Sequence, residues 1–204
     1  MNKDIEFSEL MTAKFCHDLS GPIGAVSNSI DFLDSSNADM RKKAVELVQF
    51  SSNQAVNRIM FLRQAYGVLP PGADSSLSVA RDLINRFAEG SKLVIKFTAK
   101  DTGGVIEGSL CKLLLNMVVI LSAIMMSNGK LDVTLNKQSA YFSGTSSSYN
   151  IDKSLIDILK GKNDDKVTTR TIQYFYTYHI AKEAGYTITM DKKNDKIAFN
   201  LVKK

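Results

Sequence analysis

The feature that most constrains the fold is an amphipathic pattern in residues 15–33. At about 100° per residue, the spacing of its apolar residues places them along one stripe of an α-helix. His17 falls about 165° from the middle of that stripe. We therefore predict a long helix, near residues 7–34, that buries one side and turns His17 toward solvent. The apolar positions are Phe15, Leu19, Ile23, Val26, Ile30 and Leu33.

Small and polar residues share the outer side of this helix with His17. Gly21 and Gly24 lie about one and two turns further along, and Ser20 and Asn28 lie close by. A glycine inside a helix costs about 1 kcal/mol relative to alanine. Two glycines at this place indicate that the surface of another protein comes close to the backbone beside His17.

A second amphipathic helix follows after a short turn. We predict that it begins with Asp39 as its N-cap and ends at Gly67. A single hairpin of two helices leaves apolar residues uncovered, and two hairpins packed as a four-helix bundle would bury them. We therefore predict a homodimer, and the alternative is that the hairpin packs against the rest of its own chain. The additional apolar residues of the second helix are Leu47, Val56, Met60 and Phe61.

The pattern changes after residues 70–76, which combine prolines, a glycine and short polar residues and so mark a domain boundary. We expect a helical-hairpin domain over residues 1–69 and a second domain over residues 74–204, with Asp74 or Ser75 capping its first helix. The second domain mixes helices with antiparallel strands, which is typical of an α+β sandwich. Predicted helices cover residues 77–88, 107–126, 152–159 and 167–184, and predicted strands cover residues 93–98, 130–136, 140–142, 186–190 and 196–202, the last two joined by a turn over residues 192–195.

The residues that begin at His17 form a recognisable motif, HDLSGPI, in which an acidic residue, an apolar residue and then Pro22 follow the histidine. This run resembles the H-box of sensor histidine kinases. With Gly24 and Asn28 continuing the pattern, it looks most like the ChpT-type histidine phosphotransferases, relay proteins that are built like a histidine kinase but no longer use ATP. The resemblance spans nearly the whole chain, and this motif is its sharpest part.

The resemblance implies a histidine phosphotransferase of a two-component phosphorelay. His17 is then the phospho-acceptor, which takes a phosphoryl group from the receiver domain of a hybrid histidine kinase and passes it to the receiver domain of a response regulator. Asp18 is expected to act as the local base or to hold the imidazole tautomer, and Lys14 to offset phosphoryl charge. The residues expected to contact the receiver are Ser20, Gly21, Gly24, Asn28, Arg58 and Arg63.

The second domain resembles the ATP-binding domain of histidine kinases, but its nucleotide motifs are degenerate. Asn116 stands where the kinase N-box has a metal-holding asparagine, and the ligands expected a turn later are replaced by apolar residues. Residues 142–148 stand where kinases have their adenine-reading motif, and they contain no carboxylate. Residues 101–104 have the composition of that motif but lie before the N-box helix, so a turn explains them better. Residues 167–170 stand in place of the glycine-rich phosphate loop. We therefore expect that this chain binds no ATP, no other cofactor and no metal. The partner receiver domain is expected to supply Mg²⁺, and Asn116 is expected to have a structural or remnant role.

Composition excludes other classes of protein. The net charge of +5 comes from scattered lysines and arginines, which do not form a patch for nucleic acid. No apolar run is long enough for a membrane span and no signal peptide begins the sequence, so we expect a cytoplasmic protein. Cys16 and Cys111 fit free thiols, and His179 fits an ordinary core or surface histidine.

Two alternatives stay open at this point. One is a true ATP-dependent histidine kinase with a divergent nucleotide site, and the other is a non-catalytic scaffold that uses the bundle face only for docking. In kinases that also act as phosphatases, a polar residue four positions after the histidine orients the attacking water. This chain has Gly21 there, so the resemblance implies weak or no phosphatase activity.

Overall fold

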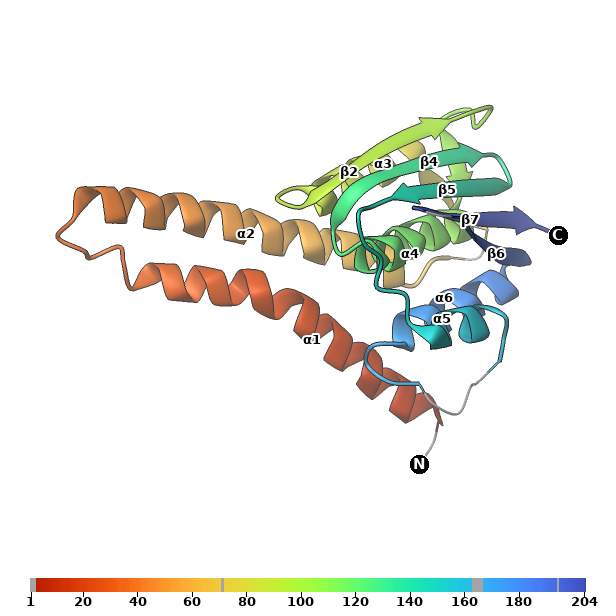
Figure 1. The fold of residues 1–204 in the computed structure, drawn as a ribbon, viewed down its shortest axis with the longest axis horizontal. Helices are drawn as coiled ribbons and strands as arrows, with labels where there is room; N and C mark the ends of the chain where they lie inside the picture. Colours follow the sequence, from red (N-terminus) through yellow and green to blue (C-terminus); the bar gives the residue numbers. More distant parts are fainter. Residues whose placement is uncertain (1–2, 71, 163–166, 194) are drawn as a thin grey trace.

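Two long helices form an antiparallel hairpin in the first part of the chain. In the computed structural model, which describes residues 3–70, 72–162, 167–193 and 195–204, they are α1 (Lys3–Ile30) and α2 (Ala38–Tyr66). Their connecting turn lies far from the rest of the molecule, so the hairpin projects as an arm (Figure 1). Both helices lie where the sequence predicts them, although α1 begins earlier and ends at Ile30 rather than near residue 34.

The cap of α2 differs from the prediction. Asn37, not Asp39, is the N-cap, because its side-chain oxygen accepts hydrogen bonds from the backbone amides of Asp39 (2.9 Å) and Met40 (3.3 Å). Asp39 instead lies in the first turn, where its negative charge favours the positive end of the helix. The helix ends before Gly67 as predicted, and the Gly67 N–H donates to the carbonyl oxygen of Arg63.

A five-stranded sheet with helices packed on one face forms the second part of the chain, which confirms the α+β prediction (Figure 1). The strand order is β2-β4-β5-β7-β6, and only the β2–β4 pair is parallel. The strands are β2 (Lys92–Ala99), β4 (Asn128–Asn136), β5 (Ser139–Thr145), β6 (Tyr186–Lys193) and β7 (Lys196–Lys203). The helices are α3 (Leu77–Ala88), α4 (Gly108–Ile124), α5 (Lys153–Leu159) and α6 (Ile172–Glu183).

A second, two-stranded sheet was not predicted. It pairs β1 (Asp74–Ser76) with β3 (Val105–Glu107), so Asp74 and Ser75 lie in a strand instead of capping α3, and Ser76 occupies the N-cap position. Residues 101–104 form the predicted turn, with left-handed backbone at Asp101, Gly103 and Gly104. Helix α6 begins at Ile172, later than the predicted residue 167. Pro71 of the predicted boundary and Asn194 of the predicted β6–β7 turn lie outside the described residues.

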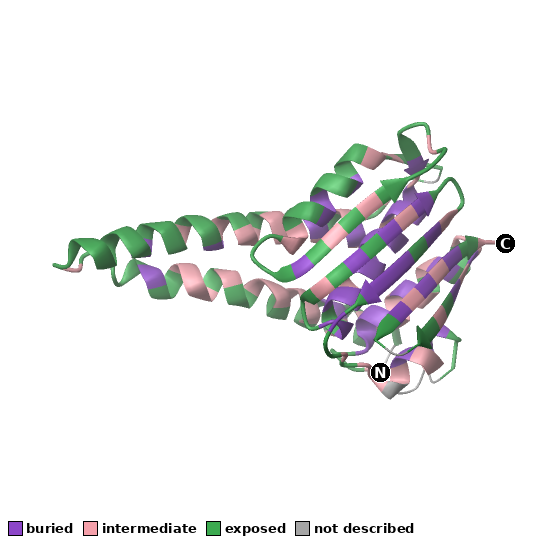
Figure 2. Cartoon of the chain, turned by 45° about the horizontal axis from the view of Figure 1, so that its top comes forward, coloured by how far each residue is buried: buried purple, intermediate pink, exposed green. Residues whose placement is uncertain are grey.

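The core lies between the sheet and α4. Thirteen of the 17 residues of α4 are buried, including Leu110, Leu114 and Ile120, and the inward side chains of the strands alternate with exposed ones (Figure 2). Alternation of this kind is expected for a sheet that has one covered and one solvent-facing side. Although α4 is strongly apolar, no helix in the described part of the chain is long and apolar enough to cross a membrane.

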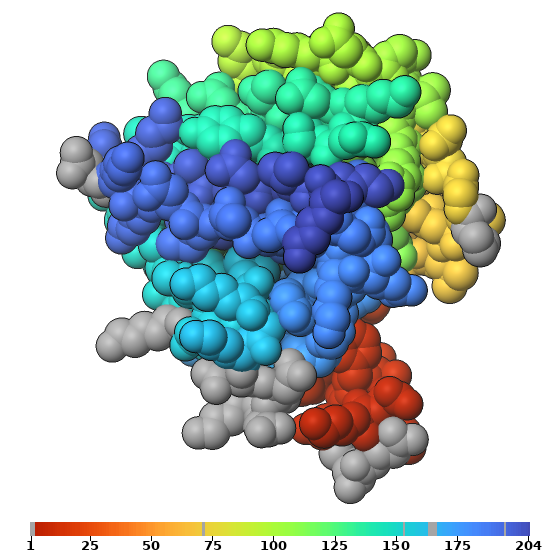
Figure 3. All heavy atoms as spheres, turned by 90° about the vertical axis from the view of Figure 1, so that its right-hand side faces the viewer, coloured from red at the N-terminus to blue at the C-terminus, as the bar shows by residue number. Residues whose placement is uncertain are grey.

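An aromatic cluster joins the hairpin to the second part of the chain. Phe7 of α1 packs against Phe175 and Tyr176 of α6, with ring centroids 5.8 and 6.1 Å apart. Tyr66, at the end of α2, packs against Phe15 at 4.8 Å and against Tyr176 at 5.1 Å. In Figure 3 the red atoms of the N-terminal helix accordingly lie beside the blue atoms of α6. The base of the hairpin is therefore fixed on the second part of the chain, which we call the sheet domain, while the far end of the hairpin projects.

The apolar stripes of the hairpin are only partly covered within one chain. Ile23 and Ile30, predicted to be buried, are 53% and 52% exposed. Phe61, predicted to face a second hairpin, is instead fully buried and stacks on Phe87 of α3 with ring centroids 4.5 Å apart. The chain therefore covers the base of α2 itself and leaves the outer part of the hairpin uncovered.

Candidate functional site

His17 lies on the solvent-facing side of α1, as the helical pattern predicts. Its side chain is 88% exposed, and its Nδ1 atom lies 3.4 Å from Oδ1 of Asp18. A distance of 3.4 Å is at the long end for a hydrogen bond, so the contact in the free protein is weak. This geometry leaves Nε2 directed away from Asp18 and accessible to a partner.

Asp18 and Lys14 form a close ion pair on the neighbouring side of the helix. The Lys14 Nζ atom donates to both carboxylate oxygens of Asp18, at 2.8 and 2.6 Å, across one helical turn. Both side chains are more than four-fifths buried, so solvent screens their interaction less than it screens an exposed pair. In the free protein Lys14 therefore compensates the charge of Asp18 and holds its carboxylate near the His17 ring.

The predicted small residues lie on α1 as expected. A Cβ atom added at Gly21 or Gly24 would meet nothing within 4 Å, so the backbone is open to a close approach there. The Ser20 hydroxyl donates to the carbonyl oxygen of Cys16 at 2.6 Å, and Asn28 is exposed. The surface beside His17 therefore has little side-chain bulk, a property that suits docking of another protein.

A cleft of about 160 Å³ separates this part of the hairpin from the sheet domain. Lys14 and Asp18 line one side of it and Arg58 of α2 lines another, whereas the exposed Arg63 does not line it. The structure therefore places Arg58, but not Arg63, on the cleft that Asp18 also lines. Residues that the sequence did not single out complete the walls; they are Phe61, Leu62, Phe87, Val119, Ser122, Ala123 and Ser127.

Asn116 is fully buried and fully hydrogen-bonded. Its Nδ2 donates to the carbonyl oxygens of Ala65 (3.0 Å) and Lys112 (2.8 Å), and its Oδ1 accepts from Nε2 of Gln173 at 2.6 Å. The Gln173 side-chain oxygen in turn accepts from the hydroxyl of Tyr66, whose pKa burial raises well above its usual value. The side chain of Asn116 therefore links α4 to α2 and α6, which agrees with the structural role proposed from the sequence.

The segment in place of the adenine-reading motif is closed by a tyrosine. The backbone N–H of Ser146 donates to the Tyr149 hydroxyl at 3.0 Å, and that hydroxyl reaches the carbonyl oxygens of Gly144 (3.1 Å) and Asp195. Within the described residues, no group of three or more His, Cys, Asp or Glu side chains is arranged to hold a metal ion. Residues 142–148 contain no carboxylate side chain that could contact a nucleotide base.

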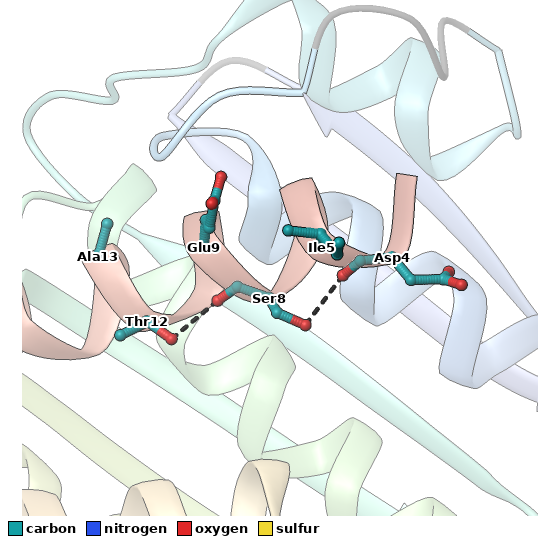
Figure 4. A pocket seen from close by; sticks show the side chains of 6 residues that line it. All are labelled: Asp4, Ile5, Ser8, Glu9, Thr12 and Ala13. Atoms are coloured by element: carbon teal, nitrogen blue, oxygen red, sulfur yellow. Dashed lines mark hydrogen bonds between the residues drawn. The ribbon is translucent and has the colours of Figure 1, made fainter. Parts of the chain in front are cut away.

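Two other features fit ordinary structural roles. His179 is exposed and packs on Phe175 with ring centroids 4.2 Å apart, and Cys16 and Cys111 are free thiols. The hollow in Figure 4 is lined by residues of α1 alone, and the hydroxyls of Ser8 and Thr12 there donate to backbone carbonyls one turn earlier. This hollow is therefore a surface depression of one helix and offers no convergent side chains.

Comparison with known proteins gives matches that agree with one another. The model of the histidine phosphotransferase C-terminal domain matches residues 77–196. Protein phosphotransferase ChpT of Brucella abortus (strain 2308) is 23% identical over 202 residues, which cover 96% of this chain and 95% of that protein. A solved structure of a bacterial phosphotransferase aligns with a TM-score of 0.83 at 23% identity, over 97% of this chain and 96% of that one.

Proposed function

This chain belongs to the histidine phosphotransferase family, and from that premise we propose that it is a phosphorelay protein whose His17 carries the phosphoryl group. The observation that supports this assignment best is the exposure of His17 beside Asp18 within the H-box-like motif. Phosphotransfer to a response regulator is the function that follows. The hybrid kinase receiver is the proposed donor.

The proposed reaction is a phosphoryl exchange between an aspartate and a histidine. A lone pair on Nε2 of neutral His17 attacks phosphorus, the new P–N bond forms, and the P–O bond to the receiver aspartate breaks to release its carboxylate. Asp18 accepts the hydrogen bond of the Nδ1 proton and stabilises the positive charge that develops on the ring. Transfer to the second receiver reverses these changes, and each receiver is expected to bring its own Mg²⁺.

We also propose that this chain does not phosphorylate itself from ATP. Two observations support this view: all hydrogen-bonding groups of the Asn116 side chain are engaged by protein atoms, and Tyr149 bonds the segment that replaces the adenine-reading motif. A kinase needs a metal clamp and a base contact for its nucleotide. Metal binding would use the Oδ1 atom of Asn116, which is buried and already accepts the hydrogen bond from Gln173.

The partly uncovered hairpin supports the proposal of a homodimer. Large apolar side chains on the outer part of α1 and α2 are about half exposed in one chain, as at Ile23, Ile30 and Leu47. Exposed apolar surface of this kind commonly marks an interface. A second hairpin packed on it would complete a four-helix bundle and present two His17 residues for docking.

A two-step transfer assay tests the proposed function. The purified chain is given either ATP alone or a panel of receiver domains phosphorylated with acetyl phosphate, and acid-labile phosphate on His17 is measured by mass spectrometry. We expect label only from a receiver, and none in His17→Ala; acetyl phosphate without a receiver is the control. Label from ATP alone would identify a kinase, and receiver binding without any transfer would identify a scaffold.

A further inference from the structure

Arg58 is held in the cleft by an aromatic side chain from the other domain. Its guanidinium carbon lies 5.4 Å from the ring centroid of Phe87, which belongs to the last turn of α3. The same ring also stacks on Phe61, which is fully buried, with ring centroids 4.5 Å apart. A cation over an aromatic face is attracted by the electron density of the ring. Phe87 therefore restricts where the Arg58 guanidinium lies.

The turn that follows Phe87 is fastened to α2. Asn57 Nδ2 donates to Glu89 Oε2 at 3.2 Å, and Gln54 Nε2 donates to the Glu89 carbonyl oxygen at 3.4 Å. Gly90 has a φ of 76°, and a Cβ atom there would come within 2.5 Å of the Phe50 ring. The positive φ favours glycine at this position, and together with the two hydrogen bonds to Glu89 it gives the end of α3 a defined position against α2.

Among the residues that the structure describes, no carboxylate forms an ion pair with Arg58. Across the cleft, Lys14 and Asp18 neutralise each other at 2.6 Å. Arg58 is also half-buried, so its charge is screened less than that of an exposed arginine. Arg58 is therefore an oriented cation, available to an anionic partner, in the cleft that Asp18 also lines.

We propose that Phe87 is a positioning residue for phosphotransfer, which holds Arg58 where it binds the anionic phospho-aspartate site of the docking receiver domain. This inference rests on the proposed function, since it needs a receiver at His17. Phe87 acts only through Arg58 and touches neither His17 nor the phosphoryl group. The sheet domain thereby takes part in the relay through a side chain of α3, without any nucleotide.

The test measures the rate of transfer to His17 against the concentration of a receiver domain that phosphorylates the wild type. Arg58→Ala should raise the half-saturating receiver concentration roughly fivefold, with little change in maximal rate, because it removes a binding charge. Phe87→Met, which keeps apolar volume without a ring, should raise it about twofold to threefold. Both effects should shrink at high salt, and Phe87→Tyr, which keeps the ring, should behave as wild type.

The double variant decides between positioning and packing. In the Arg58→Ala background, Phe87→Met should have no further effect on the half-saturating concentration, because its role passes through Arg58. Arg81→Ala, an exposed charge removed from α3 away from the cleft, is the matched control and should change nothing. Thermal unfolding of each variant checks that it is folded, and Phe87→Leu replaces Phe87→Met if the latter is not.

Two outcomes would overturn the inference. Independent, multiplicative effects of Phe87→Met and Arg58→Ala would mean that Phe87 only packs the domain interface. A fall in maximal rate without a change in half-saturation would place Arg58 in the chemical step instead of in docking. A wild-type chain that takes no label from any receiver would contradict the relay itself, so failure of the two proposals is distinguishable.

Discussion

At the scale of single residues, the relation between His17 and Asp18 sets the chemistry. The carboxylate of Asp18 lies near Nδ1, held by Lys14, and can stabilise the charged ring that forms during transfer. We predict that Asp18→Asn slows transfer about 100-fold, because an amide cannot hold that proton as a carboxylate does. Asp31→Asn, an exposed aspartate beyond the end of α1, is the matched control. Single-turnover transfer from a phosphorylated receiver measures both, and a wild-type rate in Asp18→Asn would refute the role.

Gly24 allows stability and docking to be separated at one position. Because a Cβ atom there meets nothing within 4 Å, we predict that Gly24→Ala stabilises the protein by about 1 kcal/mol, the gain in helix propensity. The same methyl group should weaken receiver binding if the partner approaches the backbone. Gly24 is a better choice than Gly21, which precedes Pro22 and would add a steric cost. Chemical denaturation measures the stability, and transfer rates at different receiver concentrations measure the binding. Unchanged transfer in Gly24→Ala would argue against a close approach of the receiver to the α1 backbone.

At the scale of secondary-structure elements, the polar chain from Tyr66 through Gln173 to Asn116 joins three helices inside the core. We predict that Gln173→Leu destabilises the protein by about 3 kcal/mol, because it leaves the Tyr66 hydroxyl and the Asn116 oxygen buried without partners. Gln138→Leu, the same change at an exposed turn, should stay within about 0.5 kcal/mol of wild type. Urea unfolding compares them, and equal stabilities would show that the network contributes little.

The ribbon of β1 and β3 is tied to the sheet through Glu107. Burial alone raises the pKa of this carboxyl, but hydrogen bonds from Lys203 and Ser109 and the charge of Lys203 together outweigh that effect, so the pKa lies below its ordinary value. A depressed carboxyl pKa stabilises the fold above the unfolded pKa, and this contribution is lost as pH falls. We predict that wild type loses more stability than Glu107→Gln between about pH 7 and about pH 3. Parallel acid-unfolding curves for the two would contradict this.

The elements also show what the sequence can and cannot predict. Helical periodicity was enough to predict α1, α2, α3 and the exposure of His17, because these depend on local spacing. It missed β1 and β3, whose short strands depend on pairing across about thirty residues of chain rather than on a local pattern. It also missed the cleft walls at Phe87 and Ser122, since contacts between segments distant in the chain leave no periodic signal.

At the scale of the whole molecule, the outer part of the hairpin determines the assembly. In one chain Ile30 is 52% exposed, although it belongs to the apolar stripe that the sequence predicts to be buried. Burial of this stripe therefore requires a partner that covers it. We predict that the wild type has twice the 22.5 kDa mass of one chain in light scattering, and that Ile30→Asp shifts it to the monomer. An unpaired charge in a bundle core costs several kcal/mol, about enough to dissociate a small interface.

A matched change elsewhere makes this test specific. Val94 of β2 is 63% exposed on the open face of the sheet, so Val94→Asp adds the same charge outside the proposed interface and should leave the dimer intact. A monomeric wild type would favour the alternative that each hairpin relies on its own chain. Dissociation by Val94→Asp but not by Ile30→Asp would place the interface on the sheet. His17 lies on the side of α1 opposite the apolar stripe that contains Ile30. A monomeric Ile30→Asp protein should therefore still accept phosphoryl groups. Its transfer should be slower than that of the wild type only if the second hairpin contacts the docked receiver.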